Sequence, residues 1–288
     1  MMAGDPYFPY VSLLLHFDGQ NGSTSFTDSS GSPKSISAVG NARISTAQSA
    51  FGGASAYFDG SGDGLSIPFS SDLSLQGVDF VVEGLARYNG SSGYQTLIDF
   101  RGSAAYTASW GAFLDIANRS FGIYDGTVNS TVLYTATNSI PPPGNWFSWC
   151  VEKVGTTTLI YIGGAVAASG STWVPPATHS SGVRIGINQA DSDAFNGYMD
   201  ELRITKGVAR YADNYTPSSV AFADSASVEV ESFISVPGIL GVSQAVAYLP
   251  VSSLSQSGHI LGSVVSLAQV VTAGKSVAET PLGAIVVK

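Results

Sequence analysis

The chain has 288 residues, which is enough for one large domain or two smaller ones with a substantial core. Hydrophobic residues make up 44% and charged residues only 11%, and short β-branched or aromatic runs alternate with Gly, Asp, Asn and Pro clusters. This pattern predicts an all-β protein. The formal net charge of −9 argues against nucleic-acid binding, and no apolar run approaches the roughly 18 residues that membrane insertion requires.

The chain opens with MMAGDPYFP, which has neither the basic nor the apolar region of a secretory signal. We therefore expect residues 1–9 to form an extended arm and the protein to be made in the cytoplasm. Residues 10–17 predict a strand that is apolar on both faces, as in a strand buried between layers. Residues 54–58 and 65–67 flank the sequence DGSGDG and predict a hairpin with a long loop.

The middle of the chain predicts further short strands with turn residues between them. They are expected at residues 78–88, 96–100, 110–116, 120–124, 132–135, 146–154, 156–162, 165–168 and 183–187. About a dozen strands at this spacing are typical of a two-sheet sandwich or jelly roll. Cys150 is the only cysteine, so no intrachain disulfide can form, and its aromatic-rich strand indicates a buried, inert thiol.

The sequence FNGYMDELRITKGVARY at 195–211 predicts the last strand of this domain. Strict alternation would place Tyr198, Asp200, Leu202 and Ile204 on the core face, with Met199, Glu201 and Arg203 on the other. The face that carries Glu201 and Arg203 is expected to be solvated. An inward Asp200 is costly unless donors or a cation meet it, so it is the best local indication of a site.

This segment, together with LLLHFDG at 13–19 and FGGASAYFDGSGDGLSIP at 51–68, resembles the laminin-G-like, concanavalin-A-like jelly rolls found repeatedly in bacteriophage virion proteins. The resemblance covers residues 10–222 and implies that the first and last strands lie side by side. Asp18 and Asp200 would then sit near one end of the same sheet. Where that family usually has a bulky aromatic residue, this chain has Gly84-Leu85, so the local packing is expected to differ.

Residues 223–288 are apolar and poor in charge, and Leu-Gly pairs recur at 240, 261 and 282. A regular spacing of this size predicts stacked or interleaved β-units, although chance recurrence in a biased segment is the alternative. Such a segment needs a neighbour to cover it. We therefore expect a β-rich extension for attachment or oligomerisation, with a trimer favoured.

A structural calcium ion is the one cofactor that the residues suggest. Asp18, Asp28 and Asp200, with loop carbonyl groups, could supply the oxygen ligands that Ca²⁺ prefers. Relatives of the resembled fold often hold calcium near the paired terminal strands, which strengthens this prediction. The alternative is that Asp200 accepts hydrogen bonds from backbone N–H groups and arginine.

No catalytic residues are predicted. The glucanases among concanavalin-like folds carry acidic residues at alternate positions of one strand, whereas Asp200 and Glu201 are adjacent and would point to opposite faces. His16, His179 and His259 lack metal-ligand spacing, and His16 is expected to be a hydrogen-bonded structural residue. The sequence therefore indicates a protein that is not an enzyme.

Aromatic residues in or beside predicted loops could stack on sugars, although aromatic residues at strand ends more often close the core. These are Tyr94, Tyr106, Trp110, Tyr124, Tyr134 and Trp173. The resemblance implies a virion structural protein, either a tail fibre, a tail-associated protein or a capsid decoration protein. Its jelly roll would adhere to a host surface or glycan, and its partners would be other virion proteins. The alternatives are a stand-alone carbohydrate-binding lectin module or a polysaccharide hydrolase.

Overall fold

The computed structural model describes residues 4–90, 93–101, 109–177, 180–232 and 245–250. The chain divides into two compact units, one of Tyr7–Asp224 and one that joins Met1–Pro6 to Ser225–Lys288. Helical structure in the described residues is limited to two 3-10 turns, η1 (Phe8–Tyr10) and η2 (Ser71–Leu73). Within that part of the chain, no helix has the length and apolar character needed to cross a membrane.

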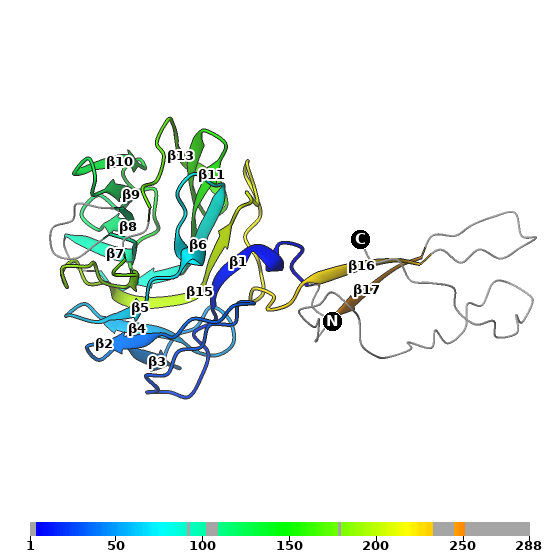
Figure 1. Cartoon of the computed structure of the whole chain (residues 1–288). Helices are drawn as coiled ribbons and strands as arrows, with labels where there is room; N and C mark the ends of the chain where they lie inside the picture. Colours follow the sequence, from blue (N-terminus) through cyan, green and yellow to red (C-terminus); the bar gives the residue numbers. More distant parts are fainter. Residues whose placement is uncertain (1–3, 91–92, 102–108, 178–179, 233–244, 251–288) are drawn as a thin grey trace, which may run out of the picture. The chain divides into compact units, whose positions relative to one another are not determined.

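The larger unit is a sandwich of two antiparallel sheets that face each other across one hydrophobic core (Figure 1). The eight-stranded sheet has the order β13-β12-β11-β6-β15-β4-β3, with β1 paired to β15. Its strands are β1 (Val11–Leu15), β3 (Arg43–Ser45), β4 (Ser55–Asp59), β6 (Phe80–Tyr88), β11 (Phe147–Val154), β12 (Thr157–Ile162), β13 (Ala165–Ser171) and β15 (Asn196–Lys206).

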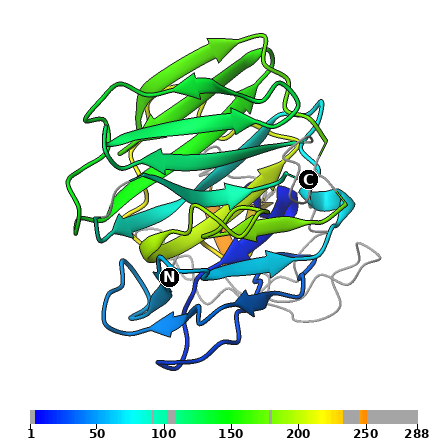
Figure 2. The same cartoon turned by 90° about the vertical axis from the view of Figure 1, so that its left-hand side faces the viewer.

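The seven-stranded sheet has the order β10-β9-β8-β7-β14-β5-β2, and it faces the viewer in Figure 2. Its strands are β2 (Ser37–Val39), β5 (Gly64–Ile67), β7 (Tyr94–Asp99), β8 (Trp110–Asp115), β9 (Ser120–Asp125), β10 (Ser130–Tyr134) and β14 (Val183–Ile185). The two sheets confirm the predicted all-β jelly-roll sandwich.

Strand β15 is the strand around which the eight-stranded sheet is built. One edge pairs with β6, and the other edge pairs first with β4 and then with β1. In the second half, Leu15 lies opposite Leu202 and Val11 opposite Thr205. The prediction that the opening and closing strands lie side by side is therefore confirmed. All five residues of β1 are buried, as expected for a strand covered on both faces.

The predicted alternation along β15 is wrong in its first half, because a β-bulge interrupts the strand. The pairing with β6 shifts register between Asp200 and Arg203, and Glu201 has a positive φ of 51°. A bulge adds one residue to one strand, so the side chains before and after it no longer follow a single alternation. Met199 joins Leu202 in the core, whereas the prediction placed these two residues on opposite faces.

Glu201 and Arg203 are also not solvated as predicted, since only 1% and 5% of their surface is exposed. They lie beneath residues 207–222, which fold back over the outer face of the eight-stranded sheet and are called the covering segment below. The Phe222 N–H donates to Glu201 Oε2, and the Arg203 guanidinium lies 3.7 Å from the centre of the Phe222 ring. The covering segment thus converts a predicted surface into a second buried layer.

Strands β4 and β5 do not form the predicted hairpin, because they belong to different sheets. The carboxylate of Asp63 accepts hydrogen bonds from the N–H groups of Asp59 (3.0 Å) and Asn41 (2.8 Å). Gly60 and Gly62 supply positive φ angles of 85° and 74°. This loop carries the chain across the sandwich, which neither hydrophobic pattern nor turn composition distinguishes from a hairpin.

The hairpins predicted in the middle of the chain are confirmed by the pairings of β8 with β9, β11 with β12 and β12 with β13. The departure from the resembled family at Gly84 also has a structural explanation. Trp149 lies opposite Gly84 on β11, and a Cβ atom at Gly84 would lie 3.4 Å from Trp149 Cζ2. The indole from the neighbouring strand occupies the space over this glycine.

In the second unit, β16 (Ser227–Ser232) and β17 (Ala245–Pro250) form an antiparallel pair. Asp5 forms a parallel bridge with Ala226, and its N–H donates to the Ser225 carbonyl (2.9 Å). Part of the expected arm therefore pairs with the start of the C-terminal segment. The three Leu-Gly pairs lie outside the described residues, so the repeat stays a prediction.

Candidate functional site

Three aromatic side chains meet on the outer face of the seven-stranded sheet. Tyr94 of β7 and Tyr134 of β10 expose 56% and 39% of their surface, and Phe113 of β8 lies between them, half-buried. The ring of Phe113 is 5.3 Å from that of Tyr94 and 6.1 Å from that of Tyr134, centre to centre. These three residues are called the aromatic face below. The strands that carry them belong to the sheet that faces the viewer in Figure 2.

A glycine on β9 makes this arrangement possible. Gly122 lies opposite Phe113 on β8 and opposite Tyr134 on β10. A Cβ atom at this position would lie 2.4 Å from Phe113 Cζ and 2.8 Å from Tyr134 Cδ2, distances that no real side chain tolerates. Without a side chain at Gly122, the two rings lean over the β9 backbone and leave their other surfaces to solvent.

Polar groups border the aromatic face and are fixed by one another. Asp115 accepts hydrogen bonds from the Tyr134 hydroxyl and from Asn118 Nδ2 (2.8 Å). Burial raises the pKa of Asp115, but these hydrogen bonds outweigh it and hold the pKa below its ordinary value. Burial and the bond to Asp115 raise the pKa of Tyr134 to about 12, so its hydroxyl remains a donor at neutral pH.

A second tyrosine on the same sheet is positioned by a buried ion pair. Arg101 donates to both carboxylate oxygens of Asp99, from Nε (2.8 Å) and Nη2 (2.9 Å), and its guanidinium lies 4.8 Å from the centre of the Tyr124 ring. A bidentate pair of this kind fixes the orientation of the guanidinium plane. Tyr124, which also bonds Asn129 through its hydroxyl, is therefore held rigidly on β9.

The aromatic residues singled out from the sequence separate into different environments. Tyr94, Tyr124 and Tyr134 lie on the outer face of the sheet, whereas Trp110 is fully buried in the core. Trp173 packs edge-on against Trp110 at 5.6 Å and donates its indole N–H to Asp125. Tyr106 lies outside the described residues. The sequence analysis missed Phe113, although its alternation with the buried Ala112 and Leu114 would have placed it on the outer face.

An acidic cluster lies at the end of β1 and the bulge of β15. Asp200 Oδ2 accepts from the N–H groups of Ala50 (2.7 Å) and Phe51 (3.1 Å), while its buried Oδ1 has no hydrogen-bond partner in the described part of the chain. Burial raises the pKa of Asp200 to about 7 despite these two hydrogen bonds, and the nearby charges of Glu201 and Asp18 add to this effect. The predicted alternative, in which Asp200 accepts from backbone N–H groups, is therefore present.

Asp18 and His16 complete this cluster. The Asp18 carboxylate rests against the backbone at Gly52, where an added Cβ would lie 2.0 Å from Asp18 Oδ1. Burial, followed by the charge of Glu201, raises the pKa of Asp18. His16 Nδ1 lies 2.9 Å from Glu201 Oε1, and this hydrogen bond raises the pKa of His16. His16 is the hydrogen-bonded residue that the sequence predicts.

The bulge also changes the relation between Asp200 and Glu201. The prediction that they point to opposite faces is wrong, because both carboxylates lie on the outer side of the sheet, where residues 50–51 and Phe222 donate to them. The sequence argument against a glucanase-type acid pair therefore no longer holds. Both carboxylates are almost fully buried.

Asp28 has a different role from Asp18 and Asp200. Its Oδ1 accepts from the N–H groups of Leu14 (3.0 Å) and Ser30 (2.9 Å). Its Oδ2 accepts from Ser30 Oγ (3.0 Å) and the Lys34 N–H (2.8 Å). Four donors occupy the lone-pair directions of a carboxylate, so Asp28 fits the role of a loop anchor and does not fit as a calcium ligand. No group of three His, Cys, Asp or Glu side chains is arranged to hold a metal ion among the residues that the structure describes.

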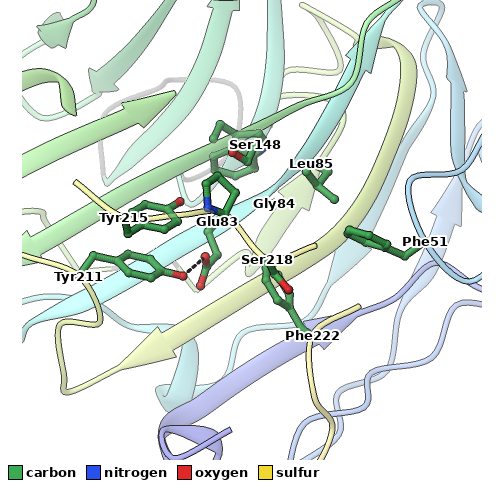
Figure 3. Close-up of a pocket in the computed structure, with 11 residues that line it drawn as sticks. Phe51, Glu83, Gly84, Leu85, Ser148, Tyr211, Tyr215, Ser218 and Phe222 are labelled. Carbon is green, nitrogen blue, oxygen red and sulfur yellow. Dashed lines mark hydrogen bonds between the residues drawn. The ribbon is translucent and has the colours of Figure 1, made fainter. Parts of the chain in front are cut away.

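A small cavity on the outer face of the eight-stranded sheet is closed by the covering segment (Figure 3). The rings of Tyr211 and Tyr215 stack at 3.6 Å, and the Tyr211 hydroxyl donates to Glu83 Oε2. The cavity measures about 20 Å³, which is about the space of one water molecule. Cys150 is fully buried beside Tyr161, and burial raises its pKa, in agreement with an inert thiol.

A larger hollow of about 230 Å³ lies beside the turn between β11 and β12. Its two charged groups serve the turn itself, because Lys153 Nζ donates to the Gly155 carbonyl and Asp79 accepts from the Gly155 N–H, both at 2.8 Å. The aromatic face differs from both hollows because it presents two exposed tyrosine rings, Tyr94 and Tyr134, in contact with one phenylalanine.

Comparison with known proteins identifies the family. A model of the Concanavalin A-like lectin/glucanases superfamily (Laminin_G_3) matches residues 59–212, more than half of the chain. The chain therefore belongs to this superfamily, as the resemblance of its motifs implies. No curated protein matches it.

Solved structures share the fold at low sequence identity. Domain 4 of AbnA, an extracellular arabinanase from Geobacillus stearothermophilus in complex with arabinotriose, matches with a TM-score of 0.52 and 18% identity, over 73% of this chain and 97% of that domain. The binding domain of Paraclostridial Mosquitocidal Protein 1 matches with a TM-score of 0.55 and 11% identity, over 70% of this chain and 50% of that one.

A structure concerned with the entry of botulinum neurotoxin type C into cells through two ganglioside molecules matches with a TM-score of 0.51 and 16% identity, over 70% of this chain and 49% of that one. The chain thus spans about half the length of these two toxin chains. At such identities these likenesses establish the fold.

Proposed function

We propose that the jelly roll of residues 7–224 binds carbohydrate through the aromatic face of Tyr94, Phe113 and Tyr134. The observation that carries this proposal is the exposure of two tyrosine rings around a central phenylalanine, on a sheet whose other large apolar side chains are mostly buried. Aromatic rings offer apolar area at little cost in conformational entropy, and their hydroxyl groups can bond a polar ligand. The C–H face of a sugar ring and its hydroxyl groups match these two properties.

Two further observations support carbohydrate as the ligand. The Tyr134 hydroxyl, Asp115 and Asn118 form a fixed polar border beside the rings. Two solved proteins with this fold are also associated with saccharides: the arabinanase domain is in complex with arabinotriose, and cell entry of the neurotoxin depends on gangliosides. The polar border would orient a saccharide that the rings hold.

The test is a glycan array followed by isothermal titration with the best ligand. Each aromatic contact contributes about 0.5–1.5 kcal/mol beyond its buried area, so Tyr94→Ala with Tyr134→Ala should weaken binding at least about tenfold. Tyr10→Ala is the matched control, because Tyr10 is 48% exposed and lies outside the aromatic face. Equal binding by the double variant and the wild type would contradict the proposal.

We further propose that the protein is a non-enzymatic structural component of a bacteriophage virion, in a tail fibre, another tail-associated position or a capsid decoration. The resemblance of residues 13–19, 51–68 and 195–211 to virion jelly rolls supports this role. The jelly roll would display the aromatic face towards the host surface. Residues 223–288 would attach it to other virion proteins or join copies of the chain, with a trimer favoured, after synthesis in the host cytoplasm.

Oligomeric state separates this role from that of a stand-alone lectin module. Size-exclusion chromatography with light scattering should show an oligomer for the full chain and a monomer for residues 1–222. If the full chain and residues 1–222 are both monomeric, the result would favour the stand-alone lectin module. Hydrolysis of a bound polysaccharide by the purified protein would instead favour a hydrolase.

We also propose that a cation, with Ca²⁺ preferred, binds between Asp18 and Asp200. The unpartnered Oδ1 of Asp200 and the raised pKa of both carboxyl groups support this site, because a cation would relieve both. Backbone carbonyls and water would supply the remaining oxygen ligands. Excess chelator should lower the melting temperature, whereas an unchanged melting curve would contradict the site.

A further inference from the structure

A straight row of four side chains crosses the outer face of the eight-stranded sheet. Arg43 on β3 lies opposite Tyr57 on β4, Tyr57 lies opposite Tyr198 on β15, and Tyr198 lies opposite Arg87 on β6. The Arg43 guanidinium is 4.7 Å from the Tyr57 ring centre, and the Arg87 guanidinium is 5.6 Å from that of Tyr198. The two tyrosine rings are 5.0 Å apart. These residues are called the Arg–Tyr row below.

The two guanidinium groups of the row are held by neutral groups. Arg43 Nη1 donates to the Asn41 carbonyl (3.1 Å), and Arg87 Nη1 donates to Asn89 Oδ1 (3.2 Å). Arg101, Arg184 and Arg203, in contrast, each pair with a carboxylate. Within the described residues, neither Arg43 nor Arg87 forms a salt bridge, so their charges are available to an anionic ligand.

One acidic neighbour of the row, Asp59, is already engaged. Asp59 follows Tyr57 by two residues on β4 and therefore shares its face. Its carboxylate accepts from Asn41 Nδ2 (3.2 Å) and from the Ser61 N–H (2.8 Å). Asp59 thus serves its own turn and forms no ion pair with Arg43.

The row also lies beyond the cover that protects the rest of this sheet. The covering segment buries Glu83 and Arg203, and Figure 3 shows Tyr211, Tyr215 and Phe222 around that part of the sheet. All four side chains of the row are instead half-exposed. A chain of formal charge −9 thus presents a local cationic row with two aromatic rings between the charges.

We propose that the Arg–Tyr row binds an acidic oligosaccharide, with sugar rings along the exposed edges of Tyr57 and Tyr198 and sugar carboxylates against Arg43 and Arg87. Three strand spacings separate the two arginines, roughly 14 Å, so a chain of several sugars fits the row better than a single anion does. An acidic peptide fits less well, because β4, β15 and β6 are paired on both sides, and a peptide added at the edge strand β3 would run along that strand and not across the row. This site is separate from the aromatic face and does not depend on it.

The test is isothermal titration of the full chain with trigalacturonate, with the neutral trigalactoside as the matched ligand. Wild type should bind the acidic trisaccharide more tightly, and the preference should shrink between 50 and 500 mM salt, conditions that screen exposed charges to very different degrees. Arg43→Gln with Arg87→Gln should weaken binding of trigalacturonate about tenfold and leave the melting temperature and trigalactoside binding unchanged. No preference for the acidic ligand in the wild type would overturn the proposal.

Three further measurements separate specific binding by the row from a general effect of charge, from misfolding of the variant and from peptide binding. Arg119→Gln removes a half-exposed arginine that bonds Asn138 on the other sheet, and an equal loss in this control would reduce the effect to general electrostatics and overturn the site. Arg43→Lys with Arg87→Lys keeps the charges and should restore part of the affinity, even if the glutamine variant folds poorly. A tri-glutamate peptide that binds as tightly as trigalacturonate would overturn the saccharide assignment.

Discussion

The two outer faces of the sandwich differ in how they treat polar side chains. On the seven-stranded sheet, two tyrosine rings are exposed beside Phe113. The carboxylates of Asp99 and Asp115 accept hydrogen bonds from residues of that sheet and its adjoining loops. On the eight-stranded sheet, Glu83, Glu152 and Arg203 are buried under the covering segment. The covering segment thus buries the outer face of the eight-stranded sheet except at the Arg–Tyr row, whereas the tyrosines of the aromatic face remain exposed on the other sheet.

The covering segment is held in place by buried charged side chains of the sheet beneath it. Glu152 accepts from the N–H groups of Arg210, Tyr211 and Ala212, and from the Tyr161 hydroxyl. These bonds hold the covering segment by its backbone, and Tyr211 and Phe222 also hold it through their side chains, at Glu83 and Arg203. The aromatic face, in contrast, depends on side-chain packing over Gly122.

The largest effect on stability is expected from breaking the ion pair of Arg203 and Glu83 beneath the covering segment. Arg203→Met removes the closer ionic partner of the buried Glu83 (2.7 Å) and leaves Arg210 at 3.8 Å, which should lower the free energy of unfolding by about 3–5 kcal/mol. Urea denaturation measures this change. Arg119→Met on the open sheet is the control and should stay within about 0.5 kcal/mol. A loss of similar size in both variants would show that the two faces do not differ as described.

The acidic cluster around Asp200 predicts that the stability of the protein depends on pH. The pKa of Asp200 is raised to about 7 in the folded protein, whereas that of an unfolded Asp is about 3.9, so the folded protein binds this proton more tightly. In excess chelator, the resulting stability is present in full below about pH 4 and is lost as pH rises through 7, by on the order of 3 kcal/mol. Denaturation as a function of pH measures the slope.

Two comparisons sharpen this measurement. Asp200→Asn removes the titrating group and should flatten the curve over the same range. Added Ca²⁺ should restore stability at pH 8 in the wild type and have no effect in the variant. A wild-type curve that is flat in chelator would contradict the burial of an unpaired carboxylate at this edge.

A smaller effect is expected from crowding the open face. Gly122→Ala places a methyl group 2.4 Å from Phe113 Cζ, so the rings must move, at a cost of about 1–3 kcal/mol. Binding of the glycan ligand should weaken as well. Gly31→Ala is the control, because its Cβ would lie 4.0 Å from Phe8 Cε1, an ordinary van der Waals contact. Unchanged binding by Gly122→Ala would separate the rings from the function.

The smallest effect concerns the polar border of the aromatic face. Tyr134→Phe keeps the ring but removes the donor to Asp115, which should cost about 0.5–1.5 kcal/mol of stability and raise the pKa of Asp115. NMR titration of the Asp115 carboxyl group measures the pKa shift. Glycan affinity should fall less than in Tyr134→Ala. An equal loss of affinity would assign recognition to the hydroxyl group.

Much of the fold could be predicted from the sequence, because alternation and turn residues act locally. The hairpins β8–β9 and β11–β12 follow from apolar runs on either side of short turns, and the burial of Leu13 and Leu15 follows from a strand with apolar residues on both faces. The pairing of β1 with β15 required the family resemblance. The crossing from β4 to β5 was missed, because the hydrogen bonds of Asp63 to two separate segments leave no local pattern.

The candidate sites show the same limit. The tyrosines of the aromatic face were recognised as candidates, but their meeting over Gly122 joins residues from four strands. The Arg–Tyr row likewise joins β3, β4, β15 and β6, and no spacing along the chain relates its members. The bulge at Glu201 offsets the two halves of β15, so the alternation that holds for Leu202 and Ile204 fails for the residues before the bulge.

By itself, the sequence determined the class of the protein: few charges, β-branched and aromatic runs and closely spaced turns leave a β-sandwich as the way to bury its apolar area. It also determined that Asp200 would be an exception, because a carboxylate in an apolar strand must find donors or a cation. Only the tertiary structure decided which of the two sheets has its outer face covered by the chain. That choice depends on residues 207–222 folding over one sheet, a long-range contact whose free energy comes from buried hydrogen bonds and ion pairs.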